Sequence, residues 1–328
     1  MRIVITGGHG FLGREVAAEL MRRGQVAGTP ITEVVLADRV GELVPGARSV
    51  IGDLQETLPQ LFAEPVDVVI HLAAAVSGES EADLDLGLRA NLDLTHGVLD
   101  AARAQQAAGG PTVRLFFASS VAVYGADAAL PLPEAVTEAT YPQPQNSYGA
   151  EKVACETLIA DYTRRGLVDG RVARLMTVSV RPGKPNAAAS GFLSGIIREP
   201  LAGVPAVCPV DPQQRVVIAS PRRTVEGILA MLDIERGTAP GQLTGRLPVN
   251  LPGLSVTVRE MIDGLRRVAG DDVADRVTVE RDPAVEAIVA SWPERFDNTR
   301  AEALGLYADD SIDAVIEQYV ADHPDSVH

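Results

Sequence analysis

Short apolar runs alternate with amphipathic stretches through the first half of the chain. Strand length and a high content of β-branched residues mark four runs: RIVIT (2–6), EVVLAD (33–38), VDVVIHLA (66–73) and VRLFFASS (113–120). Segments after the first, third and fourth of these runs predict helices over 11–23, 81–105 and 147–165. Strands and helices in this alternation predict right-handed crossovers and a parallel sheet, which is an α/β fold of the doubly wound Rossmann type.

The pattern changes after Arg181. Prolines divide the chain into short pieces there, at positions 182, 185, 200, 205, 209 and 212. We therefore predict a main domain over 1–182 and a smaller, interleaved C-terminal lobe over 183–328. Residues 215–237 are expected to return to the main domain, with a helix over 224–235.

Two capping boxes predict further helix starts in the C-terminal part. Thr257 is followed three residues later by Glu260, and Thr299 by Glu302. Gly305 is placed to end the second of these helices.

Composition agrees with a parallel sheet. The 328 residues are 46% hydrophobic but only 4% aromatic, so Ala, Val, Leu and Ile must build the core. A net charge of -15 argues against nucleic acid as a partner, and an acidic substrate would need local cations. Cys155 and Cys208 predict neither a disulfide framework nor a metal site. No apolar stretch reaches the roughly 18 residues of a membrane span, so we expect a soluble, cytoplasmic protein without membrane contact.

A glycine turn follows the first predicted strand. TGGHGFLG (6–13) places Gly7, Gly10 and Gly13 between a strand and a helix. Bare backbone amides and the positive end of a helix can hold a pyrophosphate at such a place. The motif therefore predicts a dinucleotide site.

Acidic residues at the next two strand ends refine that site. A carboxylate at Asp38 can accept hydrogen bonds from the ribose hydroxyls of NAD and repel the extra phosphate of NADP. Arg39 could reach that phosphate, which leaves NADP as the alternative. Asp53, in IGDL, either bonds the adenine amino group or caps the next helix.

The segment YGAEK (148–152) carries the candidate chemistry. Positions i and i+4 of a helix share one face, so Tyr148 and Lys152 project to the same side. A nearby ammonium favours the phenolate, which makes the pair a general acid/base. A surface Tyr and Lys on one helix is the alternative interpretation. Upstream, FFASSVAVYG presents Ser119 and Ser120 at a strand end, where a hydroxyl could hold a substrate oxygen.

These motifs together resemble the extended short-chain dehydrogenases/reductases, the group that includes the sugar-nucleotide epimerases and dehydratases. TGGHGFLG, HLAA (71–74), RANLDLTHGVL, SSVAVYG and YGAEK occur in the order typical of that family. The resemblance implies that Tyr148 is the acid/base, Lys152 its partner and Ser120, rather than Ser119, the serine of the triad. It also implies a structural or proton-relay role for Asn91, and a homodimer that pairs through the helices around Asn91 and Tyr148.

The predicted cofactor is NAD. The predicted cofactor-binding residues lie in the glycine turn, at the strand ends and in YGAEK: Gly7, Gly10, Phe11, Leu12, Gly13, Asp38, Arg39, Asp53, Leu54, Leu72, Ala73, Ala74, Ser77, Tyr148 and Lys152.

Departures from the family pattern favour one subgroup. The 4,6-dehydratases have an Asp-Glu pair after the catalytic hydroxyl, whereas Val121 and Ala122 follow Ser120 here. Epimerases tend to continue from Arg181 as Arg-x-x-Asn-x-x-Gly-Pro, and this chain reads RPGKPNAAAS. The segment RPGKPNAAASGFLSGIIREPLAG resembles the D-erythronate dehydrogenases, which oxidise the 2-hydroxyl of a four-carbon sugar acid with NAD. The same resemblance implies Ser77 as a further site residue.

A sugar acid needs an anchor for its carboxylate. The candidates are Lys184, Asn186, Ser190, Arg198 and the pair Arg222 and Arg223, with a solvated turn or surface charge as the alternative for each cation. The predicted substrate-binding residues are Ser77, Ser120, Tyr148, Lys184, Asn186 and Ser190. A nucleotide-sugar 4-epimerase and a non-catalytic cofactor-binding scaffold remain alternative functions.

The histidines do not suggest a metal. His71 is expected to pack beside the cofactor, and His9 to face solvent or a phosphate. His96 has no partner at metal-ligand spacing, so no metal is predicted.

Overall fold

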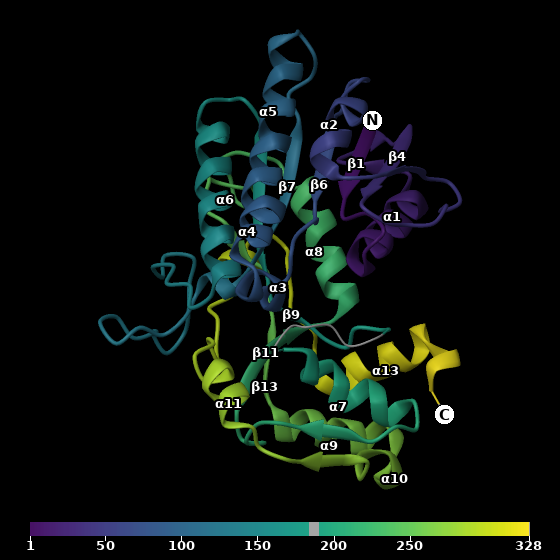
Figure 1. Cartoon of the computed structure of the whole chain (residues 1–328), viewed down its shortest axis with the longest axis vertical. Coiled ribbons are helices and arrows are strands. Elements are labelled where there is room, and N and C mark those ends of the chain that lie inside the picture. Colours follow the sequence, from purple (N-terminus) through teal and green to yellow (C-terminus); the bar gives the residue numbers. More distant parts are fainter. Residues whose placement is uncertain (184–189, 328) are drawn as a thin grey trace.

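Seven parallel strands form the central sheet in a computed structural model that describes residues 1–183 and 190–327 (Figure 1). Their order is β12-β8-β7-β6-β1-β4-β5. The bounds are β1 Arg2–Thr6, β4 Glu33–Asp38, β5 Arg48–Ile51, β6 Val68–His71, β7 Arg114–Ser120, β8 Asp169–Leu175 and β12 Val249–Asn250. The chain moves outward from β1 to β5 and then crosses back to β6, so the strand order reverses beside β1. A crevice forms at such a point, at the carboxyl ends of the strands. The predicted Rossmann-type fold is confirmed.

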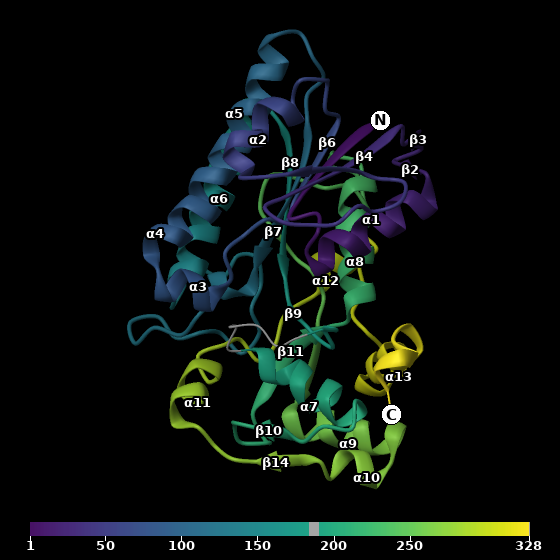
Figure 2. The same ribbon diagram turned by 45° about the vertical axis from the view of Figure 1, so that its right-hand side comes forward.

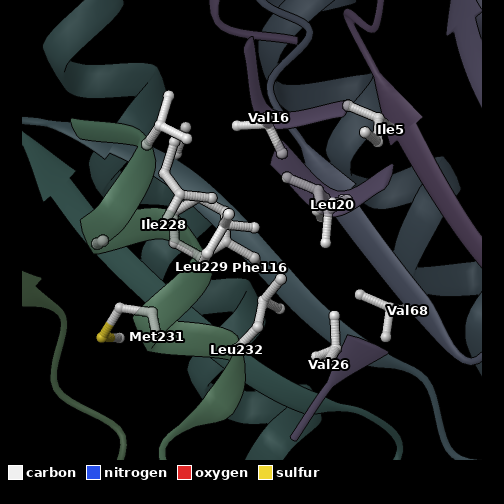
Figure 3. Packing of buried hydrophobic residues seen from close by; sticks show 14 of the residues in the cluster. Ile5, Val16, Leu20, Val26, Val68, Phe116, Ile228, Leu229, Met231 and Leu232 are labelled. Carbon is white, nitrogen blue, oxygen red and sulfur yellow. The ribbon is translucent and has the colours of Figure 1, made fainter. Parts of the chain in front are cut away.

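Helices cover both faces of this sheet (Figures 1 and 2). One face carries α1 (Phe11–Arg23) and α8 (Pro221–Asp233). The other carries α2 (Leu54–Leu61), α5 (Leu94–Ala107) and α6 (Ser147–Arg164). Figure 3 shows aliphatic side chains of α1 and α8 packed together against the strands.

The predicted helix over 81–105 is wrong as a single element. The structure divides it into α3 (Ser77–Ala82), α4 (Leu84–Gly87), a π-helical turn η1 (Leu88–Asp93) and α5. Asp83 causes the first break, because its backbone is extended (φ -141°) and its side chain accepts a hydrogen bond from the backbone of Leu86 at 2.9 Å. An aspartate in that geometry starts a new helix instead of continuing the old one.

A second lobe lies below the carboxyl ends of the strands (Figures 1 and 2). Its helices are α7 (Gly191–Leu201), α9 (Val258–Ala269), α10 (Asp271–Ala274), α11 (Pro283–Val289) and α13 (Ile312–Asp322), and β10 (Ala206–Cys208) pairs there with β14 (Val277–Val279). A small sheet of β9 (Thr177–Val178), β11 (Arg215–Ala219) and β13 (Leu254–Thr257) lies between the body and this lobe. The remaining elements are β2 (Gln25–Val26), β3 (Thr29–Pro30), η2 (Val121–Val123), α12 (Thr299–Glu302) and η3 (Pro324–Ser326).

The two predicted capping boxes have different outcomes. Thr257 and Glu260 form the expected reciprocal pair at the start of α9. Thr299, by contrast, is the first residue of α12 and not its cap, because the carboxylate of Asp297 accepts its backbone N–H at 2.9 Å. Gly305 follows α12 with a left-handed backbone (φ +79°).

C-terminal segments return to the main body. Strand β12 is the edge strand beside β8, and Ala301 and Leu306 belong to the same apolar cluster as Ile3 and Val16. The main domain therefore contains residues from both ends of the sequence.

Candidate active site

The glycine turn between β1 and α1 has no room for side chains. A Cβ at Gly7 would lie 2.7 Å from the backbone nitrogen of Ala73, and a Cβ at Gly13 would lie 2.3 Å from the carbonyl oxygen of Gly7. Gly7 also has a left-handed backbone (φ +67°), which favours glycine. The turn can therefore approach a ligand closely and bring the predicted cofactor residues Gly7 and Ala73 together.

The first turn of α1 fits an anion. Gly10 precedes the helix without a side-chain cap, and the first turn, which contains Phe11, Leu12 and Gly13, has no acidic residue. The first backbone N–H groups of a helix have no partner within the helix, and they lie at its positive end. These residues fit the pyrophosphate of a dinucleotide.

The Asp38 carboxylate is held at the end of β4 beside this turn. One oxygen accepts the backbone N–H of His9 at 3.1 Å and the other that of Arg39 at 2.8 Å. A carboxylate has further lone pairs, which can receive ribose hydroxyls. Of the two environments expected for His9, solvent is wrong, because the residue is buried and a Cβ at Gly41 would lie 2.3 Å from its ring; the phosphate stays a prediction.

Asp53 and the residues after β6 flank the same region. The Asp53 side chain caps α2, because it accepts the backbone N–H of Gln55 at 2.9 Å, and Leu54 is the first residue of that helix. A contact from Asp53 to the adenine stays a prediction. Leu72 donates its N–H to the backbone of Thr6 at 3.1 Å, so 72–74 run beside the glycine turn.

Lys152 is buried beside Tyr148 on α6. The lysine side chain is only 2% exposed, and Nζ donates to the backbone oxygen of Ala118 at 2.9 Å. The same ammonium lies 4.6 Å from the ring centroid of Phe117 and 5.3 Å from that of Tyr148. An ammonium over an aromatic face is attracted to it, so these contacts fix the position of the cation next to the phenol.

The two serines at the end of β7 have different surroundings because neighbouring strand residues face opposite sides. Ser119 is buried and donates to the carboxylate of Glu156 at 2.5 Å. Glu156 also forms a buried ion pair with Arg174 at 2.6 Å. Ser120 is half-buried and accepts the backbone N–H of Ala122 at 3.1 Å. The Ser119 hydroxyl is thus bonded within the interior, which agrees with the prediction that Ser120 is the serine of the triad.

Gly149 allows the first turn of α6 to lie against the turn that follows Ser120. A Cβ at Gly149 would lie 2.2 Å from the backbone oxygen of Ala122. The glycine of YGAEK therefore brings the helix that carries Tyr148 close to the end of β7.

A buried hydrogen-bonded chain lies behind the catalytic candidates. The His71 ring contacts Thr6 Oγ1 at 2.6 Å through Nδ1 and Thr95 Oγ1 at 3.0 Å through Nε2. Thr95 donates to the backbone oxygen of Asn91 at 2.6 Å, so it accepts from Nε2–H, and Nδ1 accepts from Thr6. Burial, with a smaller contribution from the charge of Lys152, lowers the pKa of His71 to about 3. His71 is therefore a neutral residue of the interior.

Asn91 and Glu151 form a pair that the sequence did not reveal. Asn91 Nδ2 donates to Glu151 Oε2 at 2.5 Å, and Asn91 Oδ1 accepts the backbone N–H of Ala75 at 2.9 Å. The only sequence signal was an acidic residue directly before Lys152. Helical periodicity does not show that this residue faces another helix.

The structure describes some of the predicted substrate-binding residues. Lys184 and Asn186 lie outside the described residues. Ser77 begins α3, and Ser190 precedes α7 without capping it through its side chain. Arg198 is buried and bonded to the backbone oxygen of Arg181 at 2.8 Å and to its neighbour Glu199 at 2.6 Å.

The two other arginines among the substrate candidates form ion pairs with carboxylates near the surface. Arg222 lies 3.7 Å from Asp322, and Arg223 lies 2.9 Å from Glu226.

A cavity of about 80 Å³ lies between α8 and the end of β8. Met176, Thr224, Leu251 and Leu306 are among its lining residues, and none of the four predicted catalytic residues lines it. Within 1–183 and 190–327, no helix is long and apolar enough to cross a bilayer. In the same ranges, His, Cys, Asp and Glu form no group of three placed to bind a metal.

Comparison with known proteins identifies relatives along the whole chain. The family model described as NAD dependent epimerase/dehydratase family matches residues 3–239. A D-erythronate dehydrogenase of Cupriavidus necator is 48% identical over 333 residues, which cover 98% of each chain. A D-erythronate dehydrogenase of Haemophilus influenzae is 40% identical over 326 residues, covering 98% of this chain and 99% of its own.

A solved structure is similar over almost the same span. It is described as a nucleoside-diphosphate-sugar epimerase from Agrobacterium tumefaciens, with 38% identity and a TM-score of 0.92. The match covers 99% of this chain and 95% of that one.

Proposed function

Because the chain belongs to the NAD dependent epimerase/dehydratase family, we propose that it is an NAD-dependent dehydrogenase of a small sugar acid, with D-erythronate as its substrate. The observation that carries the proposal is the near-complete match to two D-erythronate dehydrogenases at 48% and 40% identity. The buried Lys152 beside Tyr148 supports the same chemistry from within this chain.

The proposed reaction assigns one role to each residue of the cluster. When bound, NAD would accept the hydride that leaves the carbon carrying the 2-hydroxyl. Tyr148, as the phenolate, takes the hydroxyl proton, and the Lys152 ammonium favours that anion. Ser120 holds the substrate oxygen in line with the phenol. Asn91 acts behind them as a structural or proton-relay residue.

Residues at the carboxyl ends of the strands are assigned to the cofactor. The glycine turn and the first turn of α1 hold the pyrophosphate, and Asp38 accepts the ribose hydroxyls. We propose NAD over NADP because the Asp38 carboxylate lies where the extra phosphate would be repelled.

The substrate carboxylate needs a cation that is not already committed. Arg198, Arg222 and Arg223 each have a carboxylate partner within the chain. Lys184 lies outside the described residues, and we propose it as the anchor from its place in the sequence, with Asn186, Ser190 and Ser77 as further substrate contacts. Replacing Lys184 by Ala should raise the KM for the acid more than the KM for NAD. Equal effects on both constants would assign Lys184 to the cofactor or the fold.

The test of the function is direct. Purified protein is mixed with NAD and D-erythronate, and the absorbance of NADH is followed over time. A dehydrogenase converts NAD to NADH in proportion to the substrate consumed. The related Agrobacterium structure keeps a second candidate open, a nucleotide-sugar 4-epimerase. Interconversion of UDP-sugars without net NADH, and no signal with any four-carbon acid, would replace the first proposal by the second.

We also propose a homodimer that pairs through the helices around Asn91 and Tyr148. Leu84 is 57% exposed and Leu88 is 36% exposed on the outer side of this region, and burying them in an interface would remove apolar surface from water. Light scattering of the purified protein tests the mass. A cytoplasmic location also remains our prediction, to be tested by cell fractionation.

A further inference from the structure

Glu151 is a buried carboxylate in the second turn of α6. Its residue is 4% exposed, and no salt bridge to it occurs among residues 1–183 and 190–327. A buried carboxylate without a cation is unfavourable unless hydrogen bonds compensate. Such a group, one residue before Lys152, therefore requires an explanation.

The carboxylate is bonded at one oxygen. Oε2 accepts Asn91 Nδ2 at 2.5 Å and Ser80 Oγ at 3.2 Å. Oε1 is buried and has no hydrogen-bond partner among the described residues. A Cβ at Gly87 would lie 2.3 Å from Oε1, so the space for this carboxylate depends on the glycine of α4.

These bonds join three segments of the site. Asn91, in the π-helical turn, accepts the backbone N–H of Ala75 at 2.9 Å and donates to the backbone oxygen of Ala75 at 3.2 Å. Ser80 belongs to α3, whose first residue is Ser77. Glu151 belongs to the helix that carries Tyr148. One side chain therefore connects the segment predicted to contact substrate and cofactor to the helix of the acid/base.

We propose that Glu151 is a positioning residue for the reaction at Tyr148. Through Asn91 and Ser80, its carboxylate sets the segment from Ala75 to Ser80, which includes Ser77, against the first turns of the helix that carries Tyr148. Glu151 does not touch the substrate. The inference rests on the proposed function for its kinetic consequence, but the linkage itself is a property of the fold.

The variant Glu151→Met removes the contact while keeping the length of the side chain. Asn91 keeps its bonds to Ala75, and removal of the carboxylate leaves no unpaired buried charge behind, so this variant should fold. Glu151→Gln is the conservative variant, since its carbonyl oxygen can replace Oε2. Asp161→Asn is the matched control, because Asp161 lies on the same helix and, among the described residues, forms its side-chain ion pair with the exposed Arg164 alone.

Two measurements test the proposal. The first is steady-state kinetics with D-erythronate and NAD, together with NAD affinity. Because a misplacement of about 1 Å can cost about a hundredfold in rate, we expect Glu151→Met to lower kcat/KM for the acid at least about tenfold. NAD affinity should fall by a smaller factor than kcat/KM for the acid, because Ser77 is the one predicted cofactor contact between Ala75 and Ser80. Glu151→Gln should recover most of the activity, and Asp161→Asn should match the unchanged protein.

The second measurement is hydrogen exchange, which needs no substrate. Glu151→Met should accelerate exchange in 75–82 and 88–93 while α8 stays protected. Unchanged exchange there, or normal kinetics in the Met variant, overturns the proposal. A uniform rise in exchange across the chain, with an equal loss of NAD affinity, also overturns it, because Glu151 would then only hold the fold together. If the unchanged protein oxidises no aldonate but the local exchange effect is present, the proposed substrate fails and the linkage stands.

Discussion

Replacing His71 by Gln should flatten the pH dependence of stability. His71 is neutral in the folded protein, because burial lowers its pKa from 6.5 to about 3. In the unfolded chain the ring titrates at its ordinary value. Between these two values the unfolded state binds the additional proton, so the folded protein loses stability as the pH falls from about 6.5 towards about 3.

The size of the effect follows from the pKa difference. Each pH unit between the two pKa values changes the free energy of unfolding by about 1.4 kcal/mol. Of a fall from about pH 8 to about pH 5, only about the last 1.5 units lie below the pKa of the unfolded chain. Protonation of His71 in the unfolded chain should therefore lower the free energy of unfolding by about 2 kcal/mol over that range. The hydrogen-bonded chain gives the physical reason, since Nδ1 accepts from Thr6 and a protonated ring would need to donate there.

The assay is urea unfolding without cofactor at about pH 8 and about pH 5, with the free energy taken from linear extrapolation. The substitution should lower the free energy of unfolding at both pH values, but the quantity compared is the difference between the two pH values within each protein. His96→Gln is the control, because His96 is a surface residue on α5 that lies 3.6 Å from Asp100. If His71→Gln loses as much free energy on acidification as the unchanged protein, the neutral, buried assignment is refuted.

Three further variants probe the site and its support. Tyr148→Phe should lower kcat by about 10² to 10⁴ while NAD still binds, and a near-normal rate would remove the acid/base assignment. Gly149→Ala places a Cβ 2.2 Å from the oxygen of Ala122, so it should lower unfolding stability by about 1–3 kcal/mol and reduce kcat, and unchanged values would contradict the close approach of α6. Arg174→Met leaves the Glu156 carboxylate buried and unpaired and should cost about 3–5 kcal/mol in a urea melt, and the double variant with Glu156→Leu should recover most of it.

Local patterns predicted the elements that depend on local chemistry. The run from Arg2 to Thr6, the glycine turn and the helix from Phe11 to Arg23 lie where periodicity placed them, because burial of one face and the turn geometry are both written in neighbouring residues. The i to i+4 spacing also placed Tyr148 and Lys152 on one helix face. Whether Ser119 or Ser120 faces the site depends on the register of β7 in the sheet.

Features that depend on distant contacts were not predictable. The break at Asp83 was missed for a different reason: its side chain caps the next helix through a local contact with Leu86, and an aspartate inside an otherwise helical pattern does not show this. The partners of Glu151 come from α3 and the π-helical turn, far back along the chain. The burial of His9 follows from its contact with Gly41, which belongs to the loop after the next long strand.

The return of β12, Ala301 and Leu306 to the main body has a consequence during synthesis on the ribosome. The apolar cluster that contains Ile3 and Val16 is not closed until the residues after 300 have emerged. Until then the growing chain exposes the apolar surface that those residues later cover, and exposed apolar surface makes an incompletely folded chain prone to aggregation. A fragment cut after residue 182 or 237 would keep that surface exposed permanently, so it should aggregate rather than serve as an isolated cofactor-binding domain.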